Sequence, residues 1–179
     1  HFTADAAVGE LDPNRGDTED QSVPLSQVDQ RTLFALARAS IRAHLEGKPE
    51  PQLPDAPELR EVRGVFVTLR TADGKLRGCI GHARARLPLR ESVRTLAVSA
   101  AVRDTRFSPL VLNELDPLEL EISVLSPLSP AKADEIEIGT HGLMIQLDHS
   151  AGLLLPQVAS ERRWTPTQFL ENTCLKAGL

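Results

Sequence analysis

The chain has 179 residues, of which 41% are hydrophobic and 25% are charged, which is enough for one globular domain with a real core and a small satellite lobe. Its formal net charge is −5 at pH 7, and no apolar run approaches the roughly 20 residues that a bilayer crossing requires. The opening residues lack the basic-then-apolar layout of a secretory signal. Two distant cysteines, neither in a Cys-x-x-Cys pair, favour reduced thiols over a disulfide scaffold. These features predict a cytoplasmic protein.

The charge is unevenly distributed along the chain. Residues 1–30 carry seven acidic side chains against Arg15 alone, a balance of −6, so the remainder carries +1. An acidic segment with few apolar residues buries too little surface to offset its ordering entropy. Residues 1–25 are therefore predicted to form a mobile acidic arm, ahead of one domain over 26–179.

An arginine-rich stretch spans residues 77–106, where seven arginines face only two carboxylates, a local charge of +5. It is either a solvated helix face with its loop or a patch for an anionic ligand. The seven are Arg77, Arg84, Arg86, Arg90, Arg94, Arg103 and Arg106.

The first predicted elements are a helix and a hairpin. Ser26 and Asp29 have capping-box spacing, and apolar residues follow at helical intervals until Gly47. The four prolines of residues 48–57 predict an extended connector. Residues 64–71 and 75–82 then read as two strands, because a turn signal of Ala, Asp and Gly separates them.

The second half continues the mixture of helices and strands. An apolar stripe over residues 89–101 predicts a helix, and alternation over 118–124 predicts a strand with one wet face. Residues 142–147 and 152–155 form a further predicted hairpin, and Thr165 caps a helix that stops near Gly178. Helices combined with antiparallel hairpins predict an α+β fold.

The most informative segment is Leu76-Arg77-Gly78-Cys79-Ile80-Gly81-His82. Strands usually avoid glycine, so Gly78 and Gly81 predict a bulge or room for a ligand at the backbone, with Cys79 displayed rather than packed. In a regular strand Arg77 and Cys79 share a face about 7 Å apart. Arg77 is therefore expected to neighbour the sulfur and to favour its thiolate, the form that reacts as a nucleophile. The alternative is a cysteine that packs as a small hydrophobe.

The histidines give weaker signals. His82 falls on the opposite face from Cys79 and would act as a base only if a bulge at Gly78 or Gly81 turned it toward the sulfur. His141 and His149 lie in predicted turns and could hold a metal only with His82 or Glu161, and no ligand spacing supports such a set. No metal and no cofactor is predicted.

Several segments resemble one known family. Leu76 to Gly81 matches the hallmark hexapeptide (LRGCIG) of the AMMECR domain family, whose bacterial and archaeal members are called AmmeMemoRadiSam system protein A. Residues 100–107, 120–126, 152–159 and 174–179 are similar to further family blocks, in order. The resemblance runs from about residue 28 to the end. Thr105 departs from it by replacing a usual proline, and relatives usually continue beyond Leu179 through another strand, so the domain is expected to be incomplete at its C-terminus.

The resemblance implies a mostly antiparallel sheet flanked by helices, a small second lobe, and a cleft between them lined by the hexapeptide. The activity of the family is not established, but its name records an association with a Memo-like protein and a radical S-adenosylmethionine enzyme, which implies a modification pathway. The candidate substrate-binding residues around Cys79 are of two kinds. The first kind is the remaining motif residues Gly78, Gly81 and His82, and the second is the family-typical positions expected at the cleft. They are Arg77, Asp104, Arg106, Gln157 and Glu161.

Three functions remain open at this level. The first is a Cys79-dependent enzyme or covalent carrier that acts on a small, anionic substrate. The second is a non-catalytic partner of the Memo-like protein and the radical enzyme. The third and least favoured is an RNA-binding module, because the core is nearly neutral and only 3% of residues are aromatic, which leaves few stacking platforms.

Overall fold

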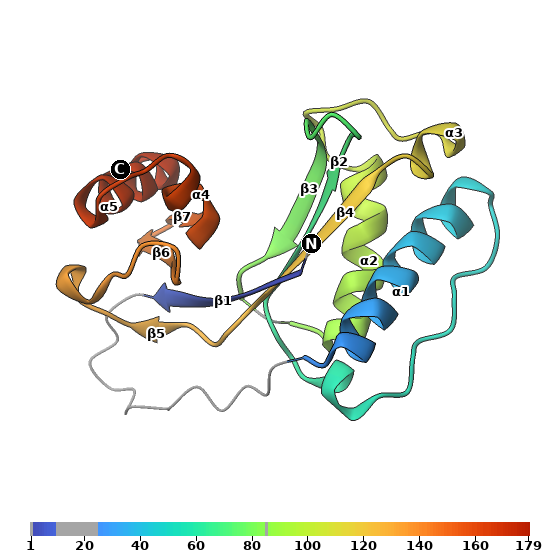
Figure 1. The fold of residues 1–179 in the computed structure, drawn as a ribbon, viewed down its shortest axis with the longest axis horizontal. Coiled ribbons are helices and arrows are strands. Elements are labelled where there is room, and N and C mark those ends of the chain that lie inside the picture. Colours follow the sequence, from blue (N-terminus) through green and yellow to red (C-terminus); the bar gives the residue numbers. More distant parts are fainter. Residues whose placement is uncertain (1, 10–24, 85) are drawn as a thin grey trace. The chain divides into compact units, whose positions relative to one another are not determined.

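The computed structural model describes residues 2–9, 25–84 and 86–179, and it has the predicted α+β class (Figure 1). The chain divides into two compact units. Among the described residues, unit 1 contains 25–124, and unit 2 contains 125–179 with most of strand β1 (Phe2–Gly9). In these ranges no helix has both the length and the apolar character needed to cross a membrane.

Unit 1 is built on a three-stranded antiparallel sheet. Strand β2 (Val65–Arg70) lies in the centre, between β3 (Leu76–His82) and β4 (Glu119–Leu125). The hairpin predicted around residues 72–74 is therefore confirmed. Along β2 every second side chain is buried in the core, as period-2 alternation requires; these are Val65, Val67 and Leu69.

Two long helices cover one face of this sheet (Figure 1). Helix α1 (Gln27–Leu45) begins where the sequence predicts, since the Ser26 hydroxyl accepts a hydrogen bond from the backbone N–H of Asp29. Helix α2 (Leu89–Val102) packs directly on β2 and β3, and α1 packs on α2. The apolar stripe of α2 is buried as predicted, so the core of unit 1 lies between α2, α1 and the sheet.

Unit 2 contains a smaller sheet and its own core. Strands β6 (His141–Leu147) and β7 (Ser150–Leu154) form the predicted hairpin, with a turn at Asp148, whose φ is 51°. Helix α5 (Pro166–Ala177) packs on both strands. Its capping box at Thr165 and its left-handed C-cap at Gly178, with φ of 82°, confirm both predicted ends.

Strand β1 lies within the segment predicted as an acidic arm. It pairs in parallel with β6 and also with the short strand β5 (Ser129–Pro130). Residues 10–24 lie outside the described residues, so the mobility of the arm stays a prediction.

The sequence patterns did not indicate the short helices. An apolar stripe is recognisable only over several helical turns, and each of these elements is too brief to show one. Among them α3 is tied to α1, because the carbonyl of Leu115 accepts a hydrogen bond of 2.7 Å from Arg38. These elements are η1 (Pro57–Arg60), α3 (Leu112–Leu115), η2 (Ala133–Glu135) and α4 (Pro156–Glu161).

Candidate functional site around Cys79

Strand β3 carries a β-bulge within the sequence motif. Leu69 is paired with Gly78, but the next residue of β2, Arg70, is paired with Leu76, so Arg77 is the extra residue on β3. The sequence predicts a bulge at Gly78 or Gly81, and the structure has it one residue before Gly78, at Arg77. A bulge breaks the strict alternation of side chains and turns one of them in a new direction.

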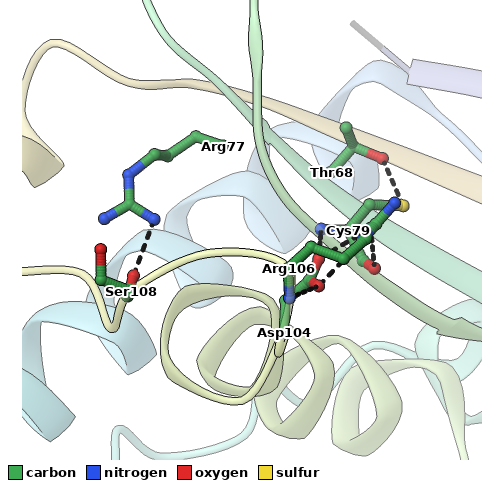
Figure 2. Close-up of polar contacts among 6 residues, drawn as sticks. All are labelled: Thr68, Arg77, Cys79, Asp104, Arg106 and Ser108. Atoms are coloured by element: carbon green, nitrogen blue, oxygen red, sulfur yellow. Dashed lines mark hydrogen bonds and ion pairs between the residues drawn. The ribbon is translucent and has the colours of Figure 1, made fainter.

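The bulge directs Arg77 away from the sulfur of Cys79 (Figure 2). Its guanidinium donates to both carboxylate oxygens of Glu114, at 3.0 and 3.1 Å, and to the carbonyl of Ser108 at 3.0 Å. This hydrogen-bonded pair also holds the pKa of Glu114 below its usual range. The expectation that Arg77 is the cation beside the sulfur assumed a regular strand, and it is wrong because the strand is bulged at that residue.

The cation beside Cys79 is Arg106, which follows α2 in the chain. One nitrogen of its guanidinium, Nη2, donates to the backbone carbonyl of Cys79 at 3.2 Å (Figure 2). The pKa of Arg106 is raised, mainly by its hydrogen bond to Asp104 and by the negative charge of that carboxylate. Arg106, rather than Arg77, is thus the arginine that contacts Cys79, and it does so at the backbone carbonyl.

Asp104 fixes both Arg106 and the strand. Its carboxylate accepts the backbone N–H of Cys79 at 2.8 Å and two guanidinium bonds from Arg106, at 2.9 and 2.7 Å. Its side chain is only 4% exposed, whereas that of Arg106 is 56% exposed. The bonds from Arg106, above all, hold the pKa of Asp104 well below its usual range, and the Cys79 N–H adds to the effect.

Thr68 is a contact that the sequence reasoning missed. It is paired with Cys79 across the β2–β3 hairpin, and its hydroxyl donates to the sulfur at 3.2 Å (Figure 2). Counting back from the turn without the bulge would pair Thr68 with Gly78 instead, and Cys79 would then face the other side of the sheet. The glycines favour a bulge but do not fix which residue it adds, so the sequence leaves the partner of Cys79 on β2 open.

The two glycines of the motif serve packing. A Cβ at Gly78 would lie 2.1 Å from the backbone oxygen of Ala100, and one at Gly81 would lie 2.2 Å from the ring of Phe66. Helix α2 and the Phe66 ring occupy the spaces that side chains at these positions would need. The expectation that the glycines leave room for a ligand is therefore wrong, although Cys79 itself is partly exposed.

The other predicted site residues lie elsewhere. His82 is exposed at the end of β3 and makes no hydrogen bond to Cys79. Gln157 and Glu161 belong to α4 in unit 2, and their part in the site stays a prediction. The Nδ1 atom of His141 accepts the backbone N–H of Glu137. Within residues 2–9, 25–84 and 86–179, no three His, Cys, Asp or Glu side chains are grouped to hold a metal.

The arginine-rich stretch is divided into separate ion pairs. Besides Arg77 and Arg106, Arg90 lies 3.7 Å from Asp55, and Arg94 lies 3.3 Å from Glu50. Both of these carboxylates come from the proline-rich connector. Four of the seven arginines are therefore paired with carboxylates, and the half-exposed guanidinium of Arg106 is the cation that contacts the motif strand at Cys79.

Known proteins are similar to this chain over most of its length. A protein of Methanothermobacter thermautotrophicus is 44% identical over 165 residues, covering 87% of this chain and 85% of its own, and one of Methanosarcina barkeri is 42% identical over 166 residues, covering 87% and 82%. The crystal structure of the uncharacterized protein PH0010 from Pyrococcus horikoshii has a TM-score of 0.74 at 42% identity, over 82% of this chain and 78% of that one. The AMMECR1 family model matches residues 34–179, and the chain belongs to the AMMECR1 family.

Proposed function

We propose that Cys79 is the nucleophile of a site that binds and covalently processes a small anionic substrate, with Arg106 holding the anionic group. The observation that carries the proposal is the guanidinium of Arg106, bound to the backbone of the residue whose sulfur would react. A guanidinium fixed at the backbone of Cys79 attracts an incoming anion to the side of the strand that it occupies.

Arg106 has hydrogen-bonding capacity to spare. Its Nε and Nη2 atoms bind Asp104 and the Cys79 carbonyl, while its Nη1 atom makes no hydrogen bond to the residues that the structure describes. Since a guanidinium presents five donors in one plane, the N–H groups of Nη1 remain for a carboxylate or phosphate of the substrate. The Arg106 side chain is 56% exposed, so a ligand can approach it from solvent.

Asp104 makes this arrangement rigid. A half-exposed arginine on a loop would otherwise sample many rotamers, and ordering it during binding would cost entropy. Because Asp104 is buried and already binds two guanidinium nitrogens, the cation is in place before a substrate arrives. Preorganisation of this kind is what a binding or catalytic site requires.

The proposal is tested with two alkylating probes of equal size and different charge. Iodoacetate is anionic and iodoacetamide is neutral; in both reactions the sulfur bonds to the methylene carbon, iodide leaves, and the thiol proton passes to solvent. Rates at pH 7 are followed by intact mass in a Cys174→Ser background, which leaves Cys79 as the single thiol. An unfolded peptide with the sequence of residues 76–82 is the reference thiol.

We expect Cys79 to react faster than the peptide by about an order of magnitude. Its preference for iodoacetate over iodoacetamide should exceed that of the peptide about fivefold, as for about 1 kcal/mol of attraction at a half-exposed site. Arg106→Gln should remove the preference, whereas Arg103→Gln, which changes an exposed arginine of the same loop, should keep it.

Peptide-like rates with both probes would overturn the proposal. They would favour the non-catalytic alternative, in which this protein serves the Memo-like protein and the radical S-adenosylmethionine enzyme as a partner. We further propose, on the family resemblance, that either role belongs to the modification pathway of those proteins.

A further inference from the structure

Thr68 occupies a rigid place directly opposite Cys79. It lies on β2, the central strand of the sheet in unit 1, which is paired on one side with β3 and on the other with β4. Thr68 is only 8% exposed. A β-branched side chain on a central strand has few rotamers, so its hydroxyl is held in one direction.

That hydroxyl is hydrogen-bonded to the sulfur of Cys79. Thr68 Oγ1 donates to Cys79 Sγ at 3.2 Å, and it makes no other hydrogen bond to the residues that the structure describes. The neutral sulfur of a thiol is a weak acceptor, whereas an anionic acceptor forms a shorter and stronger bond. A donor at this place therefore stabilises the anionic form of the sulfur more than its neutral form.

We propose that Thr68 is a positioning residue of the Cys79 site, which directs the sulfur and stabilises its anion through the Oγ1–Sγ hydrogen bond. This inference rests on the proposed function, because it assigns Thr68 a part in the same chemistry. It completes a division of labour in which three side chains hold three different atoms of Cys79. Asp104 holds the backbone N–H, Arg106 holds the carbonyl, and Thr68 holds the sulfur.

A purely structural role for Thr68 makes a different prediction. Threonine is common in strands because a branched side chain suits a pleated surface, and valine suits it at least as well. If Thr68 only filled space, Thr68→Val would leave the reaction of Cys79 unchanged. The pH profile of the alkylation rate separates the two roles, since packing alone does not move it.

The experiment compares Thr68→Val, Thr68→Ser and Thr95→Val with the parent in the Cys174→Ser background. Thr95 is exposed on α2 and controls for a threonine-to-valine change away from the site. Iodoacetamide rates are measured from pH 6 to pH 10 by intact mass, and urea unfolding confirms that each variant is folded.

Thr68→Val should slow the reaction at pH 7 by about three- to tenfold and move the midpoint of the profile upward by about half to one pH unit, with a similar plateau rate at high pH. Thr68→Ser should restore most of the rate because it retains the hydroxyl, and Thr95→Val should match the parent. A Thr68→Val profile that coincides with that of the parent would overturn the inference. If the parent still reacts faster than the peptide, that result leaves the proposed function intact. If instead the parent reacts only as fast as the peptide but Thr68→Val still shifts the pH profile, the proposed function alone is overturned.

Discussion

The carboxylate of Asp104 takes the place of a neighbouring strand at Cys79. Strand β3 is at the edge of its antiparallel sheet, and among the strands that the structure describes it is paired with β2 alone. The outward N–H of Cys79 donates to Asp104 at 2.8 Å, and its carbonyl accepts from Arg106 at 3.2 Å. An unpaired edge is a template for unwanted strand pairing, and here an ion pair blocks it beside the thiol.

We predict that Asp104→Asn destabilises the protein by about 1–3 kcal/mol. Asparagine can still accept the N–H of Cys79, but its NH2 group then faces the N–H donors of Arg106. Donors that face each other leave hydrogen bonds unmade at a buried position. Urea unfolding measures the difference. The control is Asp116→Asn, which removes a 73% exposed partner of Arg42 and should cost well under about 1 kcal/mol. Equal losses for the two variants would contradict a special role of Asp104.

At acidic pH, Asp104 should no longer contribute to the free energy of unfolding. Its folded-state pKa is depressed, mainly by the hydrogen bonds from Arg106, while the unfolded value is about 3.9. A depressed pKa contributes stability that is complete above the unfolded value and is lost as the pH falls toward the folded value. The gap in unfolding free energy between the parent and Asp104→Asn should therefore be constant above about pH 5 and shrink below about pH 4. Glu114 also has a lowered pKa, but it is present in both proteins, so its effect cancels in the difference. A gap independent of pH down to pH 2 would contradict this assignment.

Gly78→Ala should be costly because of the nearby helix. The added methyl group would lie 2.1 Å from the backbone oxygen of Ala100, so α2 or β3 has to move. Overpacking of this kind costs about 1–3 kcal/mol, and a backbone obstacle favours the upper end. Gly47→Ala is the comparison: it has φ of +65° but open space around it, so only the left-handed conformation is penalised, by about 1 kcal/mol. A smaller loss of urea stability for Gly78→Ala than for Gly47→Ala would show that α2 adjusts freely.

Local signals made the helices and hairpins predictable. The caps at Ser26 and Thr165 act within three residues along the chain, so a short sequence window contains all the information that they need. The apolar stripe of α2 is likewise a local pattern that burial confirms. The wet face predicted for β4 is present only in part, because Glu119 is exposed whereas Ser123 is buried.

The candidate site was predicted only in part, because its contacts span long sequence distances. The bond from Cys79 to Asp104 crosses 25 residues and that from Arg77 to Glu114 crosses 37. The family resemblance pointed to Asp104 and Arg106, but no local pattern shows which arginine contacts Cys79. One extra residue in β3 was enough to exchange the expected role of Arg77 for that of Arg106, and also to hide Thr68.

The exchange of roles between the two arginines is itself testable. Arg77→Gln breaks a pair whose partners are 14% and 37% exposed, so we expect a loss of about 1 kcal/mol in urea unfolding. The iodoacetate preference of Cys79 should not change, because the guanidinium of Arg77 binds Glu114 and Ser108 rather than the sulfur side of the strand. Glu114→Gln removes the other partner of the same pair and should behave alike in both measurements. A preference that falls with Arg77→Gln but survives Arg106→Gln would restore Arg77 as the neighbour of the sulfur and contradict the site described here.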